Sequence, residues 1–262
     1  MPDIMETLRA ALTASGDVLM RHFGHVEAEH KGPIDLVTVA DRESEAAAVA
    51  AIRRDHPGHA ILAEESGGQR VSGAEWRWII DPLDGTTNYA HGMPIFCVTA
   101  GVEHRGEVVA GGTFSPATDE LFLAERGAGA TRNGERIRVS SRAGLGEALL
   151  VTGFPYDRRE HVDYYMAQFG AFLARSRGVL RLGAAGMDFA HVAMGRLDGY
   201  WERGLHPWDV AAGKLLITEA GGCTSDFRGQ PFDVFGPDFL ASNGLIHSAM
   251  LDVIASCPPW DG

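Results

Sequence analysis

The stretch "WIIDPLDGTTNYAHG", residues 78–92, decides how this chain is interpreted. It places an apolar run, Trp78 to Ile80, directly before two aspartates, Asp81 and Asp84. Three adjacent apolar residues are typical of a buried strand, and two carboxylates this close repel each other unless a positive charge lies between them. The stretch therefore predicts a strand that leads into a cation site.

The residues around the two aspartates indicate which cation. Pro82 fixes its own φ and favours an extended residue before it, and Gly85 allows the chain to turn. Such a turn could aim both carboxylates and the Leu83 carbonyl at one point, and oxygen ligands of this kind suit Mg²⁺. The hydroxyls and amides of Thr86–Thr87 could hold a phosphate. The alternative is a plain tight turn, because Asp, Pro and Gly all favour turns.

The bulk composition excludes several classes of protein. The chain has 262 residues and a formal net charge of −12, so nucleic acid and anionic membranes are not expected as partners. No apolar run approaches the roughly 20 residues of a membrane span. Residues 1–24 predict an amphipathic helix and not a signal peptide, so a cytoplasmic location is expected. The three cysteines are scattered without metal-ligand spacing.

Hydrophobic periodicity predicts two halves of different style. Residues 1–143 are expected to form an α+β domain with an antiparallel sheet and most of the metal ligands, and residues 144–262 an α/β domain that supplies Asp209. Helices are predicted at about 3–22, 41–55, 159–175, 184–195 and 207–222, and at the C-terminus. Strands are predicted at 59–65, 78–80, 96–104, 107–116, 120–126, 135–140, 148–154, 178–183, 197–202 and 238–243. The glycine-rich segment 127–135 is interpreted as hairpin turns.

Further carboxylates fall at the ends of predicted elements. Asp41 is expected to open a helix, Glu64 to end a strand, and Asp209 to lie in the first turn of the helix that begins at Pro207. Side chains at such ends can converge on one site. His206 is adjacent to this set, and we expect it to pack or to cap the helix and not to act in catalysis.

Several motifs together resemble one known family. They are "AEES" at 63–66, "WIIDPLDGTTNY" at 78–89 and "WERGLHPWDVAAGKLLITEAGG" at 201–222, with further likeness at 32–45, 127–140 and 181–202. In this order, and over nearly the whole chain, they are similar to the inositol monophosphatase family.

The resemblance implies an αβαβα five-layer sandwich of the inositol monophosphatase and fructose-1,6-bisphosphatase type. It also implies a homodimeric, lithium-sensitive phosphomonoesterase. The reaction would be hydrolysis of myo-inositol monophosphate to inositol and phosphate by direct attack of a metal-bound water, with two or three Mg²⁺ per site.

The resemblance also assigns metal ligands and catalytic residues. The first metal would be held by Glu64, Asp81 and the Leu83 carbonyl, and Asp81 would bridge to a second metal held by Asp84 and Asp209. The catalytic residues would be Glu64 together with Thr86 and Asp41, the last two orienting the attacking water. A threonine hydroxyl is a poor base, so a carboxylate partner is chemically sensible.

The expected substrate contacts come from both halves. On the phosphate side they are Asp84, the amides of Gly85 and Thr86, and Lys31. On the sugar side they are Gly183, Ala184, Ala185, Glu202 and Asp209. Two of these residues have plain alternatives, Lys31 as a solvated loop lysine and Glu202 as a surface acid at a strand end.

The substrate itself stays open at this point. Thr87 favours the inositol side of the superfamily, since relatives acting on other phosphates more often carry lysine there. Segment 152–160 lies where substrate contacts vary. The alternatives are the same chemistry on histidinol phosphate, fructose bisphosphate or another sugar or nucleotide phosphate, and a catalytically idle binding or scaffold protein.

Overall fold

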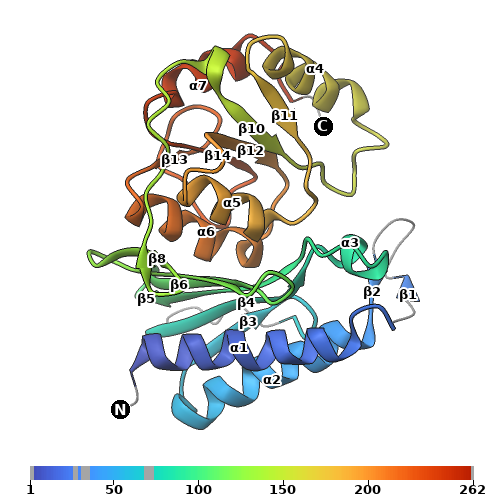
Figure 1. Cartoon of the computed structure of the whole chain (residues 1–262), viewed down its shortest axis with the longest axis vertical. Coiled ribbons are helices and arrows are strands. Elements are labelled where there is room, and N and C mark those ends of the chain that lie inside the picture. The colour runs from blue at the N-terminus through green and yellow to red at the C-terminus, as the bar shows by residue number, and fades with distance from the viewer. Residues whose placement is uncertain (1–2, 26–28, 31–35, 68–73, 261–262) are drawn as a thin grey trace.

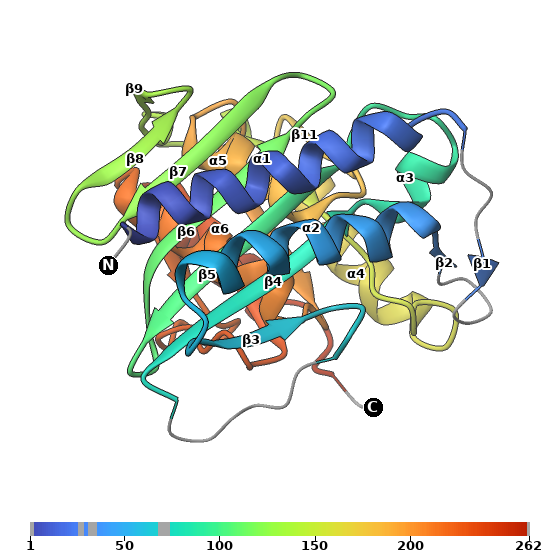
Figure 2. The same ribbon diagram turned by 90° about the horizontal axis from the view of Figure 1, so that it is seen from below.

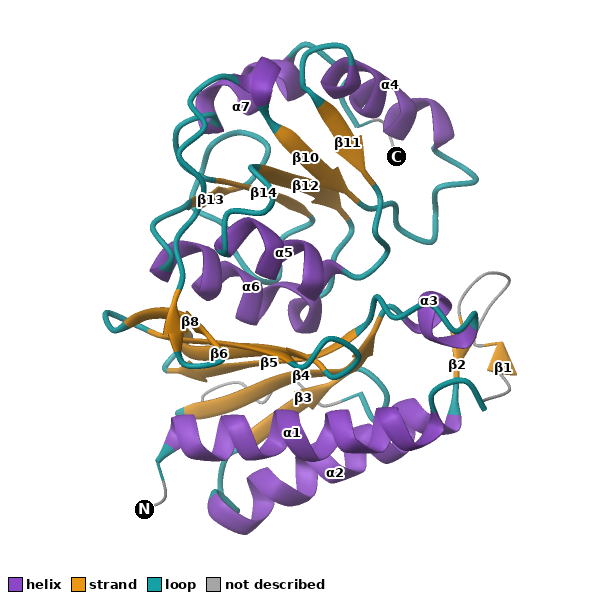
Figure 3. Cartoon of the chain, in the orientation of Figure 1, coloured by secondary structure: helices purple, strands orange, loops and turns teal. Residues whose placement is uncertain are grey.

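The computed structural model describes residues 3–25, 29–30, 36–67 and 74–260. Helices and sheets alternate in five layers from one end of the molecule to the other (Figures 1 and 3). The helices are α1 (Ile4–His22), α2 (Val39–Asp55), α3 (Thr86–Ala90), α4 (Val162–Leu173), α5 (Ala185–Ala193), α6 (Pro207–Glu219) and α7 (His247–Ala255), with a 3-10 turn at Leu145–Glu147. The predicted αβαβα sandwich is confirmed.

The larger sheet has the order β3-β4-β5-β6-β7-β8-β9. Its strands are β3 (Ala60–Ala63), β4 (Trp76–Asp84), β5 (Cys97–His104), β6 (Glu107–Ser115), β7 (Glu120–Glu125), β8 (Gly129–Arg132) and β9 (Glu135–Arg136). β3 runs parallel to β4, and the other neighbouring pairs are antiparallel. Helices α1 and α2 lie side by side across its outer face (Figure 2).

The smaller sheet has the order β11-β10-β12-β14-β13. Its strands are β10 (Leu149–Thr152), β11 (Gly178–Leu180), β12 (Gly199–Arg203), β13 (Cys223–Ser225) and β14 (Asp238–Ser242). β10 is parallel to β11 and β12, whereas β14 is antiparallel to both of its neighbours. Helices α5 and α6 fill the layer between the two sheets, and α4 and α7 cover the far side (Figure 3). A separate pair, β1 (Glu29–His30) and β2 (Leu36–Val37), is antiparallel.

The apolar run before the two aspartates is buried on both faces of β4. Trp78 and Ile80 pack toward α1 and α2, whereas Ile79 belongs to the core shared with α5 and α6. All three side chains are fully buried. A strand covered on both faces must be apolar at every position, which explains a continuous apolar run in place of alternation.

Some element predictions were wrong in detail. Gly129–Arg132 forms β8, where hairpin turns alone were expected, and the predicted strand 135–140 is confined to Glu135–Arg136. The short strands β1, β2 and β13 and the short helix α3 were not predicted. Helix α2 begins at Val39 with Thr38 as its N-cap, so Asp41 lies in the third helical position and does not open the helix.

The division into residues 1–143 and 144–262 stays a prediction. One hydrophobic cluster joins the two segments, since Ile79 and Phe122 pack in the same core as Phe189 and Leu216. Among the described helices, none is long and apolar enough to cross a membrane.

Candidate active site

A one-residue bulge in β4 brings the two opening aspartates to the same face of the sheet. Asp81 pairs with Thr99 and Asp84 with Cys97, so three steps along β4 oppose two along β5. In a regular strand, side chains three residues apart point to opposite faces, and one extra residue restores the same face. Pro82 has no N–H to lose from the ladder, which suits it to the bulge. The expected turn is thus a bulge inside the strand, and the chain turns only at Gly85.

Gly85 allows the tight passage from β4 into α3. Its φ is +90°, and an added Cβ would lie 3.0 Å from the Ile95 carbonyl oxygen and 3.1 Å from the Ala184 Cβ. A larger residue would therefore be strained both by its backbone and by its neighbours. The turn places Thr86 as the first residue of α3.

Thr86 lies within reach of Asp41, as the resemblance implies. The Thr86 hydroxyl is 3.4 Å from Asp41 Oδ1 and 3.0 Å from the Leu83 carbonyl oxygen, and it has one proton to donate. Asp41 is buried, and its Oδ2 accepts hydrogen bonds from the Thr38 N–H at 2.7 Å and the Thr38 hydroxyl at 2.6 Å. The capping box of α2 thus holds Asp41 in place and leaves Oδ1 facing Thr86.

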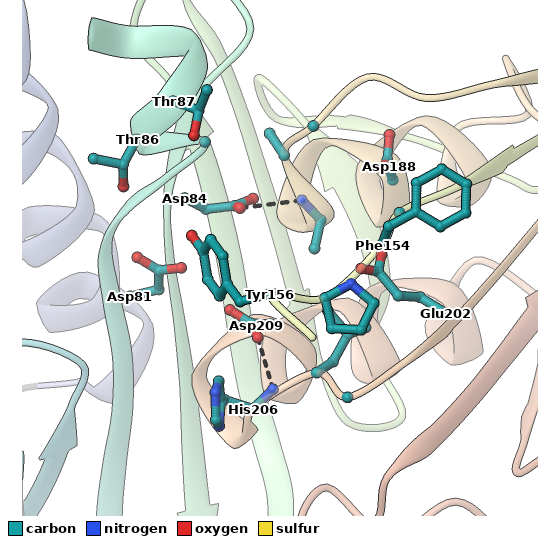
Figure 4. A pocket seen from close by; sticks show the side chains of 18 of the residues that line it. Asp81, Asp84, Thr86, Thr87, Phe154, Tyr156, Asp188, Glu202, His206 and Asp209 are labelled. Carbon is teal, nitrogen blue, oxygen red and sulfur yellow. Dashed lines mark hydrogen bonds between the residues drawn. The ribbon is translucent and has the colours of Figure 1, made fainter. Parts of the chain in front are cut away.

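The start of α5 holds the Asp84 carboxylate. Asp84 Oδ1 accepts from the Ala185 N–H at 3.1 Å, and Oδ2 accepts from the Gly186 N–H at 2.6 Å and from the Cys97 thiol at 3.4 Å. The first amides of a helix are natural partners for a negative charge. Figure 4 shows one of these bonds as a dashed line between Asp84 and the backbone at the start of α5.

Asp209 comes from the opposite direction, in the first turn of α6. Its Oδ2 accepts a hydrogen bond from the His206 N–H at 2.7 Å (Figure 4). His206 is the N-cap of α6, and its ring stacks on Trp208 at 4.8 Å between centroids. The prediction that His206 packs and caps is confirmed.

One cavity of about 540 Å³ collects these groups. The predicted residues that line it are Glu64, Asp81, Leu83, Asp84, Gly85, Thr86, Gly183, Ala184, Ala185, Glu202 and Asp209. Asp41 lies behind Thr86 and does not line the cavity, and Lys31 lies outside the described residues. The volume falls in the range of small-molecule sites, roughly 300–1,000 Å³. In Figure 4, Asp81, Asp84 and Asp209 surround a common space, with Thr86 at its edge.

The buried carboxyl groups of the cavity raise one another's pKa values, so a positive charge among them would be stabilising. Burial raises the pKa of the Asp81 carboxyl well above its ordinary value. The nearby carboxylates whose charges raise it further are Glu64, Asp84 and Asp209. The pKa of Asp209 is likewise raised well above its ordinary value, by burial first and then by the charge of Asp84. Burial also raises the pKa of Asp84, against the lowering effect of its bonds to Gly186, Cys97 and Ala185.

This donor set fits a hard divalent cation. Buried carboxylates with mutually raised pKa values are relieved by a bound metal ion, and oxygen donors suit Mg²⁺. The Leu83 carbonyl keeps a lone pair beside its bond from Thr86. Within the described ranges, no three acidic, histidine or cysteine side chains are already gathered as a closed metal cage.

Two buried acids, Glu202 and Asp188, line the part of the cavity expected to face the sugar, and only Glu202 was predicted from the sequence. Glu202 is buried, its carboxylate accepts a hydrogen bond from the Tyr200 hydroxyl, and burial raises its pKa to about 7. The alternative interpretation of Glu202 as a surface acid at a strand end is thus wrong. Asp188 also lines the cavity with Arg181. Its Oδ1 has no hydrogen-bond partner in the described part of the chain, and burial raises its pKa well above normal.

The remaining wall was only partly foreseen. Segment 153–158, which lies within the stretch expected to vary in substrate contacts, lines the cavity together with Trp208. Arg181 and Asp188 were missed. Their only sequence signal was their position around Gly183–Ala185, because an isolated Arg or Asp beside a helix start is usually a surface residue.

The fold and the site together define an α/β protein with a buried cavity of carboxylates suited to a divalent cation, and the comparisons with known proteins identify its family. A model of the inositol monophosphatase family matches residues 2–257. An inositol-1-monophosphatase of Mesorhizobium japonicum is 41% identical over 254 residues, 96% of each chain. A Nus factor SuhB of Pseudomonas aeruginosa is 41% identical over 260 residues, 97% of this chain and 96% of the other. The structure of an inositol monophosphatase from Anabaena superposes with a TM-score of 0.89 at 44% identity, covering 97% of this chain and 96% of that one.

The chain belongs to the inositol monophosphatase family. This is a family of phosphomonoesterases, and a solved structure of an IMPase/NADP phosphatase, 22% identical to this chain, is complexed with Mg²⁺ and phosphate. The predicted family is therefore confirmed. Relatives at similar identity are named both as phosphatases and as Nus factors, so similarity alone does not choose the substrate or the role.

Proposed function

We propose that this protein hydrolyses myo-inositol monophosphate to inositol and phosphate in a Mg²⁺-dependent reaction. The observation that carries the proposal is the convergence of Glu64, Asp81, Asp84 and Asp209 on one cavity beside the Thr86–Asp41 pair. A buried group of like charges is unfavourable by itself and favourable around a cation that faces a phosphate.

The proposed ligands divide into two sets. Glu64, Asp81 and the Leu83 carbonyl would hold one Mg²⁺, and Asp81, Asp84 and Asp209 would hold a second. The ions would supply positive charge against the phosphate oxygens and acidify a water molecule. Two such ions, or three, are proposed per site.

The chain's own residues would then position the reacting groups. The Thr86 hydroxyl orients the attacking water and relays its proton toward Asp41 Oδ1, which faces it across 3.4 Å. The Gly85 and Thr86 amides hold the phosphate. Lys31, outside the described residues, is retained as a proposed phosphate contact.

The polyol would lie against the opposite wall. The Glu202 carboxylate can accept hydrogen bonds from two hydroxyls, and the Gly183–Ala185 backbone limits the space beside them. Asp84 and Asp209 reach both halves of the cavity. A buried carboxylate that accepts from neighbouring hydroxyls distinguishes a polyol from an apolar alcohol, since the latter would leave the acid unpaired.

The test is phosphate release from D-myo-inositol 1-phosphate at saturating Mg²⁺, with Asp84→Asn as background. The same kcat/KM measurement on histidinol phosphate and fructose 1,6-bisphosphate ranks the alternatives. A higher kcat/KM on either compound would replace inositol phosphate in the proposal. No turnover on any of them would contradict the phosphatase assignment.

A second candidate is the role carried by relatives named Nus factor SuhB, one of which is as similar to this chain as the named phosphatase. Under that reading the acidic cavity would bind Mg²⁺ without appreciable turnover. A homodimer, a cytoplasmic location and the absence of a nucleic-acid partner remain predictions that go with the first candidate.

A further inference from the structure

One buried face of α2 contacts three separate segments of the candidate site. Asp41, Ser44 and Glu45 are spaced i, i+3 and i+4, so they lie on the same side of the helix. Each side chain is less than one-tenth exposed. We call these three residues the polar face of α2. Asp41 faces Thr86 of α3, and Ser44 and Glu45 contact two other segments of the site.

Ser44 contacts the bulge that carries the two aspartates. Its hydroxyl donates to the Pro82 carbonyl oxygen at 2.8 Å, between Asp81 and Asp84. The Ser44 oxygen lies 2.5 Å from the Ser15 hydroxyl of α1, which can donate to it in turn. A two-hydroxyl chain therefore ties the bulge to both outer helices.

Glu45 contacts the turn that carries Glu64. Its Oε2 accepts from the Glu65 N–H at 2.8 Å, and its Oε1 accepts from the Ser66 N–H at 3.0 Å. A buried carboxylate close to an already acidic cavity is costly unless it is well hydrogen-bonded. Both carboxylate oxygens are used here on the backbone of one turn, as charge-assisted bonds.

The hydrogen-bond ladder between β3 and β4 ends just before the two proposed metal ligands Glu64 and Asp81. Its last paired residues are Ala63 and Ile80, and one further bond joins the Glu64 N–H to the Ile80 carbonyl at 3.2 Å. Glu64 and Asp81 thus stand where the two strands part. Helix α2 contacts the segments of both, through Ser44 at the Pro82 carbonyl and through Glu45 at the Glu65 and Ser66 N–H groups.

We propose that Ser44 and Glu45 are positioning residues that set Glu64 against the Asp81–Asp84 bulge, so that α2 aligns the separate segments that hold the metal ions. The proposal rests on the metal ligands of the proposed function. Asp41, on the same face of α2, contacts Thr86, so the same helix also positions Thr86 relative to the metal ligands. The polar face of α2 therefore sets the geometry of the metal site without touching the substrate.

The first test replaces Glu45 by Gln, whose side chain offers one acceptor oxygen and turns an NH₂ group toward the other backbone N–H. Mn²⁺ affinity is measured by electron paramagnetic resonance, and half-saturating Mg²⁺ by phosphate release. We expect the Mn²⁺ affinity to fall, and the half-saturating Mg²⁺ concentration to rise, about tenfold or more. The kcat at saturating Mg²⁺ should stay within about threefold of the parent protein. Glu43→Gln is the matched control, because it removes the same charge from the exposed side of the same helix, where Glu43 pairs with His22.

A double-mutant cycle separates positioning from a merely structural role. If Glu45 acts through Glu64, then Glu45→Gln has little further effect on Mn²⁺ affinity in a Glu64→Gln background. Unchanged Mn²⁺ affinity in Glu45→Gln, even with a lowered Tm, would overturn the proposal, and so would full additivity of the two changes.

Ser44→Ala keeps the proposal testable if Glu45→Gln does not fold. It removes the hydroxyl bonded to the Pro82 carbonyl and should also weaken Mn²⁺ binding, severalfold, with little effect on kcat at saturating Mg²⁺. Failure of the proposed function is distinguishable, because Mn²⁺ binding needs no substrate. A protein that binds Mn²⁺ in a Glu45-dependent manner but releases no phosphate supports the inference and refutes the phosphatase. A protein that binds no Mn²⁺ refutes both.

Discussion

Gly101→Ala should move Asp209 by crowding α6 against the larger sheet. Gly101 lies in β5, and a Cβ added there would be 2.7 Å from the Ala211 Cβ and 3.3 Å from the Ala211 carbonyl carbon. Gly111 of β6 approaches Ala212 just as closely, with 2.9 Å between an added Cβ and the Ala212 Cα. Small residues on both sides thus let the helix lie directly on the strands, and Asp209 is in its first turn.

The size of the effect follows from the overlap. Ordinary contact begins at 3.4 Å, so the new methyl group would be about 0.7 Å too close to Ala211. Because Ala211 is a helix residue with no flexible side chain to move aside, the helix itself has to shift. Overpacking of this kind costs about 1–3 kcal/mol of the free energy of unfolding. A displacement approaching 1 Å in a catalytic group can cost up to about 100-fold in rate.

The assay combines urea unfolding with phosphate release at varied Mg²⁺. We expect a weaker Mg²⁺ response and a 10- to 100-fold lower kcat/KM, by the same displacement argument. Gly144→Ala is the matched control, since an added Cβ there meets nothing within 4 Å. The exchange Gly101→Ala with Ala211→Gly should recover activity while remaining about 1 kcal/mol less stable, the cost of glycine in a helix. Full activity and Mg²⁺ response in the single variant would refute the idea that this contact positions Asp209.

Three further predictions address charge and burial. Asp84→Asn should keep the fold, as judged by circular dichroism, but lower kcat by roughly 100-fold or more, because metal charge stabilisation is worth several kcal/mol; retained activity would mean that the ligand set is wrong. Li⁺ should inhibit phosphate release more than Na⁺ at equal ionic strength, and equal rates in the two salts would count against a second metal position of the proposed kind. His247 is buried between the Ser225 and Ser242 hydroxyls, each 2.9 Å away, and burial lowers its pKa. The contribution of neutral His247 to the free energy of unfolding is therefore complete above the unfolded pKa of about 6.5 and declines below it, by at most about 1.4 kcal/mol per pH unit. Urea unfolding at pH 7.5 and 5.5 should show a smaller pH dependence of stability in His247→Asn than in the parent protein. An equal dependence in both proteins would contradict the assignment.

Local patterns predicted most of the secondary structure because they depend on near neighbours in the chain. The apolar run of β4 and the Pro-initiated, Gly-terminated helix α6 are examples, and both were confirmed. Two of the strands that were missed, β8 and β13, have only four and three residues. Strands this short contain too few residues to show an alternation of apolar and polar positions. They form because their backbones hydrogen-bond to a longer neighbouring strand, β7 or β14.

The sequence by itself determined the family, the order of the elements and the acidic residues available for a metal site. It also placed Asp81 and Asp84 after a strand that must be buried on both faces. The tertiary structure alone decided how these residues meet. The bulge opposite Cys97 turns Asp81 and Asp84 to one face, close helix-on-sheet packing brings Asp209 to them, and the start of α5 holds Asp84. Local propensity says which element a residue joins, whereas the distance between two elements depends on the volumes of all the side chains packed between them, which no short stretch of sequence contains.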